Sequence, residues 1–191
     1  MPKVEVVYAS RHGSTAGIAL WIADELRSAG VEVEVADAAD RPAVEGFDAY
    51  VIGSAIYMGS WLKDGVEFLA RHESVLATRP VWLFSSGPLP GSSKTTDETD
   101  PLVVALGPEE GPGSGGHKKI ARLSAAIQPR EHRVFLGAFD PDDPPKTLPE
   151  RFVRLLPISR DILPVGDFRD RGAVQAWARE ISASLSGVQV A

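Results

Sequence analysis

Hydroxyl side chains surround a glycine near the start of the chain, where an apolar run ends. The run covers residues 4–9, and the residues that follow it include Ser10, Gly13, Ser14 and Thr15. Backbone N–H groups in a first helical turn lack intrahelical partners and carry the positive end of the helix dipole. Hydroxyl donors add to these groups, and a residue without Cβ lets a phosphate approach closely. Residues 10–15, called the phosphate turn below, therefore predict a phosphate site. A well-capped first helix is the alternative interpretation.

Two common nucleotide-binding motifs do not fit the phosphate turn. A Walker A loop needs Gly-x-x-x-x-Gly-Lys-Ser/Thr, and no Lys occupies the turn. A dinucleotide fingerprint needs Gly-x-Gly-x-x-Gly after the first strand, whereas only Gly13 and Gly17 are present there. Residues 111–116 have the fingerprint's spacing, but no strand precedes them and Pro112 interrupts them, so we interpret them as flexible linker. The turn thus predicts one phosphate rather than a dinucleotide.

Two further loops of small residues follow apolar runs. Residues 53–61 read Gly-Ser-Ala-Ile-Tyr-Met-Gly-Ser-Trp, and residues 85–88 read Ser-Ser-Gly-Pro. The first loop carries aromatic and apolar side chains suited to covering a flat heterocycle. In a sheet of order 2-1-3-4-5, the ends of strands one, three and four meet at the topological switch point, where ligands bind. The three loops together predict a mononucleotide with a large planar base.

The elements that must position these loops alternate between strand and helix. Apolar runs and period-two alternation predict strands at residues 4–9, 31–35, 49–53, 80–85 and 133–138. Apolar residues at helical spacing predict helices at 14–29, around 62–69, from near 117 and at about 171–185. The fold class is therefore α/β, with a doubly wound, five-stranded parallel sheet of order 2-1-3-4-5. We expect one domain over residues 1–191, with a flexible loop at about 88–116 and an insertion at about 139–168.

Composition excludes several classes of protein. The chain has 191 residues, 43% of them hydrophobic, which is enough for a substantial core. It has no cysteine, and this excludes disulfides, thiolate zinc sites and cysteine nucleophiles. The net charge of −6 argues against nucleic acid as a partner. Four histidines lie on separate elements without metal-like spacing, so we interpret them as solvent-exposed and expect no metal. With no signal-peptide or membrane-spanning run, a cytoplasmic location is expected.

The chain resembles the flavodoxin-like family over nearly its whole length. Flavodoxins carry a Ser/Thr-x-Ser/Thr-Gly-x-Ser/Thr phosphate loop after the first strand, and residues 10–15, Ser-Arg-His-Gly-Ser-Thr, match it except at His12. The resemblance implies that FMN is the cofactor and that these six residues hold its phosphate. Arg11 or His12 would then replace the missing hydroxyl donor. No catalytic acid or base is implied, because the flavin performs the redox chemistry.

The same resemblance implies that the second and third loops flank the isoalloxazine ring. The residues concerned are Ser54, Ala55, Ile56, Tyr57 and Met58 of the second loop and Ser85, Ser86 and Gly87 of the third. Tyr57, or alternatively Trp61, would stack on the ring. The third loop lacks the aromatic residue that many flavodoxins place there, and this argues against stacking on both faces.

A narrower resemblance is to the HemG branch, whose members are FMN-dependent, quinone-coupled protoporphyrinogen IX dehydrogenases. Residues 8–15, 53–59, 135–138 and 166–178 carry it. It implies an oxidoreductase that accepts reducing equivalents from a porphyrinogen, or another reduced organic substrate, and passes them to a quinone. The branch's insertion tends to be basic and aromatic, whereas residues 139–150 here are acidic and rich in proline.

Two other functions stay open. A flavodoxin-type shuttle would exchange electrons with redox partner proteins and have no substrate of its own, although such carriers tend to be more acidic than −6. A flavin-free regulatory domain would have an empty phosphate turn. Apolar residues interleaved with arginines within 151–162 predict a face for substrate or acceptor, with peripheral contact to the inner membrane face through 139–168. The alternative interpretation is that a short helix in this segment simply covers the edge of the sheet.

Overall fold

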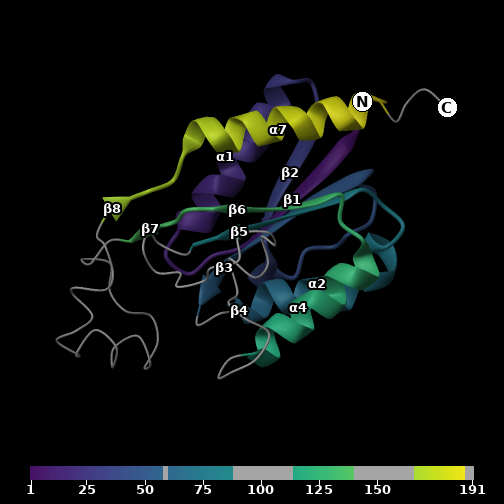
Figure 1. The fold of residues 1–191 in the computed structure, drawn as a ribbon. Coiled ribbons are helices and arrows are strands. Elements are labelled where there is room, and N and C mark those ends of the chain that lie inside the picture. Colours follow the sequence, from purple (N-terminus) through teal and green to yellow (C-terminus); the bar gives the residue numbers. More distant parts are fainter. Residues whose placement is uncertain (58–59, 88–113, 140–165, 188–191) are drawn as a thin grey trace.

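A computed structural model describes residues 1–57, 60–87, 114–139 and 166–187. Within them, five parallel strands form the main sheet in the order β2-β1-β3-β5-β6 (Figure 1). The strands are β1 (Lys3–Ala9), β2 (Glu32–Asp37), β3 (Ala49–Tyr57), β5 (Val81–Ser86) and β6 (Glu131–Phe135). Counted along the chain, this is the order 2-1-3-4-5, so the predicted α/β fold class and sheet order are confirmed.

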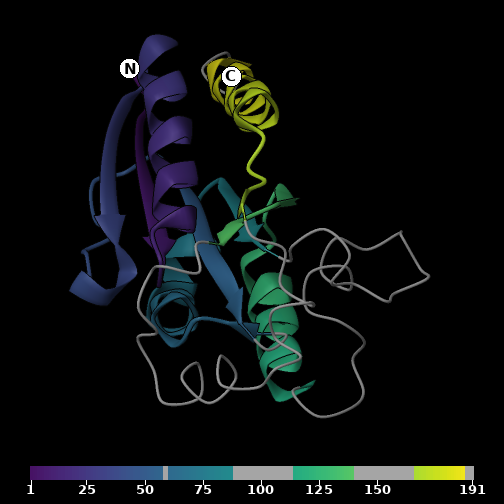
Figure 2. The same cartoon turned by 90° about the vertical axis from the view of Figure 1, so that its left-hand side faces the viewer.

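Helices cover both faces of the sheet, as Figure 2 shows end-on. The pair α1 (Ser14–Ser28) and α7 (Arg171–Ser186) lies on one face, and the pair α2 (Lys63–Leu76) and α4 (Ser114–Ile127) lies on the other. Because both faces are covered, β5 is buried along its whole length and β3 along most of it. The edge strand β2 instead exposes alternate residues, as its period-two sequence predicts.

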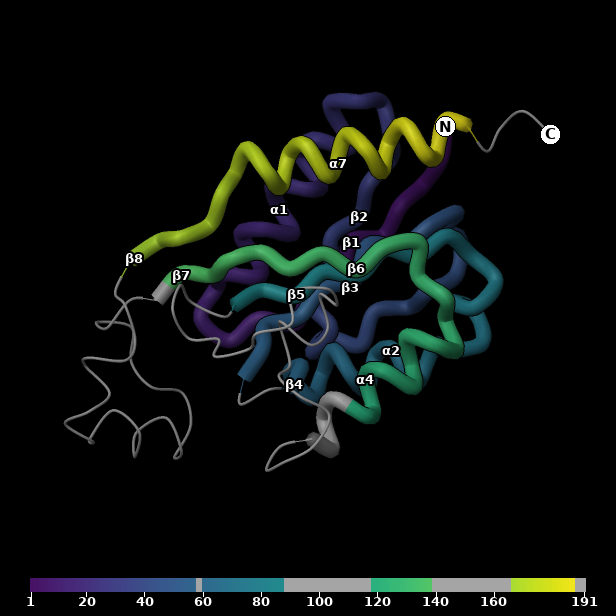
Figure 3. Tube along the Cα trace, in the orientation of Figure 1, coloured from purple at the N-terminus to yellow at the C-terminus, as the bar shows by residue number. Residues whose placement is uncertain are grey.

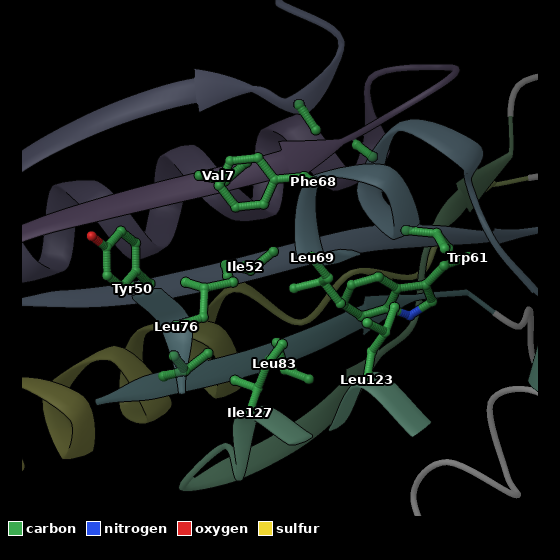
Figure 4. Packing of buried hydrophobic residues seen from close by; sticks show 14 of the residues in the cluster. Val7, Tyr50, Ile52, Trp61, Phe68, Leu69, Leu76, Leu83, Leu123 and Ile127 are labelled. Carbon is green, nitrogen blue, oxygen red and sulfur yellow. The ribbon is translucent and has the colours of Figure 1, made fainter. Parts of the chain in front are cut away.

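The two faces bury separate hydrophobic clusters. Between the sheet and α2 and α4, large side chains such as Phe68, Leu69 and Leu83 are fully buried (Figure 4). Between the sheet and α1 and α7, Trp177 and Phe84 pack edge to face with ring centroids 6.2 Å apart. Each such side chain stabilises the fold by about 1.5–3 kcal/mol. These clusters hold the strand ends in place.

Several short elements escaped the sequence prediction. Strand β4 (Ser60–Trp61) pairs antiparallel with β3, strands β7 (Ala138–Phe139) and β8 (Gly166–Asp167) pair with each other, and η1 (Ala38–Asp40) is a single 3-10 turn. The predicted strand 133–138 is wrong at both ends, because β6 begins at 131 and stops at 135. The last residue of β5, Ser86, pairs with Phe135, so β5 offers no further residue with which the chain beyond β6 could pair.

The long segments that interrupt the alternation fall mostly outside the described residues. This applies to 88–113 of the predicted loop and to 140–165 of the predicted insertion. Residues 114–116, placed in the loop by the sequence, form the first turn of α4, which therefore starts three residues earlier than expected. Among the helices of the described ranges, none combines the length and the apolar composition that crossing a membrane requires.

Candidate functional site

The carboxyl ends of β1, β3 and β5 lie at one edge of the sheet, as the predicted switch point requires. The register pairs Ala9 of β1 with Ser54 of β3, and Ala55 of β3 with Ser86 of β5. In the tube of Figure 3 the three chain segments leave the sheet on the same side, where β7 and β8 also lie. The three segments singled out by the sequence are therefore brought to one edge. The prediction that residues 53–61 form a loop is wrong for most of them, because β3 continues to Tyr57 and residues 60–61 form β4.

The start of α1 lacks the side-chain cap that the alternative interpretation requires. The N-cap residue is Gly13, in the left-handed region with φ of 84°, and no side chain of the described residues caps the helix there. The Gly13 N–H donates to Ser10 Oγ at 3.1 Å, and the helix ladder begins with Gly17 N–H donating to Gly13 O at 2.9 Å. Left-handed backbone favours glycine. The first N–H groups of α1 are thus available to an anion.

Thr15 supplies the clearest test of whether the phosphate turn fits a phosphate. Its side chain is fully buried, yet Oγ1 has no hydrogen-bond partner among the described residues. Leaving a buried hydroxyl unsatisfied costs about 1–3 kcal/mol. A phosphate oxygen at the helix start would supply the missing partner. The residues present therefore fit a phosphate group.

Residues 136–138, beyond β6, also reach the phosphate turn, which sequence reasoning missed. Ala138 N–H donates to Ser14 Oγ at 2.9 Å. A Cβ at Gly137 would lie 3.5 Å from both Ser14 Oγ and Gly87 N, so residues 136–138 meet the phosphate turn and the third loop there. Their position just after the carboxyl end of the fifth strand was the available signal.

The second loop contacts the first through an aromatic ring. The guanidinium of Arg11 lies over the ring of Tyr57, with Cζ 4.4 Å from the centroid, and the ring of His12 lies 6.2 Å away. Tyr57 and Ile56 are partly buried at the end of β3. The cation–π contact places positive charge beside the aromatic side chain predicted to meet the ligand. The remaining predicted residue of this loop, Met58, lies outside the described residues.

Two predicted hydroxyls are engaged inside the protein. Ser54 Oγ accepts a hydrogen bond from Leu62 N–H at 3.0 Å, and Ser85 Oγ accepts one from Trp61 Nε1 at 2.8 Å. Ser85 Oγ also lies 2.8 Å from His132 Nε2. The contacts of Leu62 and Trp61 anchor the start of α2 and β4 to the sheet, and the contact of His132 joins β6 to β5. Trp61 is itself buried, 3% exposed, so its ring belongs to the core.

The rest of the second and third loops contributes mainly backbone. Ala55 and Ser86 are buried neighbours in the sheet. Gly87, in the left-handed region with φ of 88°, turns the chain away from β5, and its N–H donates to Phe135 O at 3.0 Å. These residues shape the edge through their backbone.

The histidines do not have the exposure expected from the sequence. His12, His72 and His132 are each partly buried. The ring of His72 packs against Phe68 with centroids 4.8 Å apart, and burial lowers its pKa. In the part of the chain that the structure describes, no group of His, Asp or Glu residues is arranged to hold a metal ion.

A buried carboxylate lies on the α2 side of the sheet, away from the loops. Glu5 is 2% exposed and stands between Glu34 of β2 and Tyr50 of β3 in the register. Burial raises the pKa of Glu5 to about 7, and the charges of Glu34 and Glu45 add to the shift. Its Oε2 atom has no hydrogen-bond partner among the described residues.

Comparisons with known proteins agree with this geometry. A family model described as a flavodoxin domain matches residues 5–143. Protoporphyrinogen IX dehydrogenase [quinone] of Escherichia coli K12 is 31% identical over 85 residues, which are 44% of this chain and 47% of that protein. The match therefore spans about half the length of this curated relative.

Solved structures show the same fold. Rubredoxin oxygen:oxidoreductase of Desulfovibrio gigas superposes with a TM-score of 0.58 at 14% identity, covering 99% of this chain and 37% of that one. A flavodoxin from the domain Archaea superposes with a TM-score of 0.55 at 16% identity, covering 96% of this chain and 99% of that one. At sequence identities this low, the similarity shows a shared fold and nothing more.

Proposed function

The chain belongs to the flavodoxin domain family, and from that membership we propose that it is an FMN-dependent oxidoreductase coupled to a quinone. More coarsely, it is a flavodoxin-like protein of the oxidoreductase or electron-transfer type. The observation that carries the cofactor assignment is the uncapped start of α1 with the buried, unpartnered hydroxyl of Thr15. Family membership supports the same cofactor.

Each part of the site has a distinct role toward FMN. The N–H groups at the start of α1, Ser10 and Thr15 Oγ1 would hold the phosphate, because they offer donors at the positive end of the helix dipole. Tyr57 and Gly87, at the ends of β3 and β5, would flank the ring. Bound flavin supplies the electron or hydride chemistry, and the chain supplies orientation and electrostatics. The buried hydroxyls of Ser54 and Ser85 act only by fixing the loops.

The relative from Escherichia coli favours a reduced porphyrinogen as electron donor and a quinone as acceptor. The alternative is an electron shuttle that works with protein partners, and the likeness to the archaeal flavodoxin favours it. The net charge of −6 supports the enzyme, because carriers that dock on basic partners tend to be more acidic. The insertion after β6 would then serve the substrate or the acceptor.

Replacing residues 140–164 with a short Gly/Ser linker separates the two functions. Phe139 and Gly166 pair across β7 and β8, so a short linker can close the gap without moving the phosphate turn. We expect the variant to keep its FMN, seen in the absorbance spectrum, and to lose anaerobic porphyrinogen oxidation and quinone reduction. A wild-type protein that never oxidises a porphyrinogen but exchanges electrons readily with a flavodoxin reductase would establish the shuttle instead.

Tyr57→Ala is expected to weaken FMN binding by roughly 1–3 kcal/mol, the value of one aromatic–base stacking contact. It should also raise at least one reduction potential, because an electron-rich ring disfavours the electron-rich reduced flavin. Titration of the apoprotein with FMN and spectroelectrochemistry measure the two effects. Tyr57→Phe is the control, since it keeps the ring and should keep most of the affinity. If Tyr57→Ala had the same FMN affinity and the same reduction potentials as the wild type, Tyr57 would only pack at the rim of the sheet.

A further inference from the structure

Arg169, just after β8, lies against the first turn of α1. Its Nη1 atom donates a long hydrogen bond to Ser14 O, at 3.5 Å. A Cβ placed on Gly17 would lie 2.3 Å from the same Nη1 atom, so the guanidinium fills the position where a side chain would stand at residue 17. The contact joins residues 155 positions apart in the chain. The start of α1 is thus shaped by a residue near the other end of the protein.

Asp167 fixes the guanidinium in this place. Arg169 Nε lies 2.8 Å from Asp167 Oδ1, Nη2 lies 2.6 Å from Oδ2, and the Arg169 backbone N–H donates to Oδ1 at 3.1 Å. Such a two-pronged pair has a defined geometry as well as added strength. The Arg169 guanidinium, in turn, lowers the pKa of the Asp167 carboxyl. The Arg169 side chain is 18% exposed and also lies over the ring of Trp21, with Cζ 4.7 Å from the centroid.

The antiparallel pair β7–β8 provides a second contact with Ser14. Phe168 N–H donates to Gly137 O at 3.1 Å, and the next residue along, Ala138, donates its N–H to Ser14 Oγ at 2.9 Å. The carbonyl and the hydroxyl of Ser14 are therefore both engaged, one by Arg169 and the other by Ala138. Ser14 is the first residue of α1, and its neighbours are Gly13 and Thr15 of the phosphate turn.

We propose that Arg169, held by Asp167, is a positioning residue for the phosphate turn. By fixing the Ser14 carbonyl and the space beside Gly17, it sets the orientation of the first N–H groups of α1, which would bind the cofactor phosphate. The inference rests on the proposed function. Because Asp167 balances the charge of the guanidinium, the effect on the phosphate is one of geometry rather than long-range attraction.

Comparing FMN with riboflavin, which lacks the phosphate, isolates this effect. We expect Arg169→Ala to weaken FMN binding by about tenfold, in line with one lost hydrogen bond of a charged group, and to leave riboflavin binding unchanged. Arg171→Ala is the matched control, because Arg171 also lies over Trp21, at 5.6 Å, but is exposed and has no contact with Ser14 among those described. Equal losses for the two flavins in Arg169→Ala would overturn the proposal.

Gly17→Ala tests the same contact without removing any charge. A Cβ at residue 17 must displace the guanidinium, while alanine is the better helix former inside α1. A role limited to helix stability therefore predicts unchanged or tighter FMN binding, whereas positioning predicts weaker FMN binding and unchanged riboflavin binding.

The double variant tests whether Asp167 acts through Arg169. Adding Asp167→Asn to Arg169→Ala should cause no further loss of FMN affinity, since the two residues act as one unit. A clear further loss would contradict this coupling.

Amide hydrogen exchange of the apoprotein gives a readout that needs no flavin. Arg169→Ala should speed exchange in peptides that cover residues 13–20, and Arg171→Ala should not. If the wild type binds neither FMN nor riboflavin, the proposed function fails, while faster exchange still supports the positioning role. Exchange that is unchanged in Arg169→Ala would show that the residue does not hold the turn, whatever the flavin result.

Discussion

Gly13→Asp is expected to abolish FMN binding. The new carboxylate would stand at the helix start, where the phosphate needs N–H donors and positive potential. Two like charges about 4 Å apart near a protein surface repel by about 4 kcal/mol, which corresponds to a loss of affinity of several hundredfold. A Cβ at Gly13 meets nothing within 4 Å, and Asp tolerates left-handed backbone better than most residues, so the fold should survive. Flavin content after purification and FMN titration of the apoprotein measure the effect.

Gly13→Asn is the matched control, because it has the size and the backbone tolerance of Asp without the charge. It should keep most of the FMN affinity. Thr15→Ala should have a smaller effect, about 1–2 kcal/mol, for one lost hydrogen bond to a charged group. A Gly13→Asp protein that purifies with its full flavin would place the phosphate somewhere other than the phosphate turn.

Glu5→Gln is expected to make the protein more stable at pH 8 by up to about 3 kcal/mol and to change little at pH 4.5 or below. The pKa of Glu5 rises from the ordinary 4.5 to about 7 in the folded state. Between these values the folded state keeps a proton that the unfolded state has released, so the stability of the wild type falls as the pH rises. Above pH 7 the loss is complete. Glutamine stays neutral throughout and removes this fall.

Urea unfolding at a series of pH values between 4.5 and 8 measures this difference. Glu32→Gln is the control, because Glu32 lies on the neighbouring strand with its side chain 61% exposed. The free energy of unfolding of Glu32→Gln should depend on pH in the same way as that of the wild type. If the unfolding free energy of Glu5→Gln also had the pH dependence of the wild type, the Glu5 carboxylate would be ionised and solvated in the folded protein.

The regular part of the fold could be predicted from the sequence because its signals are periodic. The apolar runs of β1, β3 and β5 and the alternation in β2 give the strands, and strand–helix alternation gives a parallel sheet. The phosphate turn could be found for a related reason. Its hydroxyls and glycine lie next to each other in the chain, directly after a strand.

The contacts that complete the site could not be predicted, because they join distant segments. Arg169 and Ala138 meet Ser14 across 155 and 124 positions, and two-residue strands such as β7 and β8 have no periodicity to detect. Residue type alone also does not reveal which hydroxyls form hydrogen bonds inside the protein. Ser54 and Ser85 follow the pattern of ligand donors, yet their hydroxyls satisfy a backbone amide and an indole inside the protein.

The pairing of β7 with β8 also matters for how such a fold can diversify. Because Phe139 and Gly166 stand opposite each other, the chain departs from and returns to one point at the sheet edge. The entropy of closing a loop grows only with the logarithm of its length, about 0.6 kcal/mol for each doubling. Descendants of this fold can therefore lengthen, shorten or replace the intervening sequence, even by a whole domain, at little cost to the sheet edge where we propose that flavin binds. The β7–β8 pair is therefore a position where the fold can accept inserted sequence.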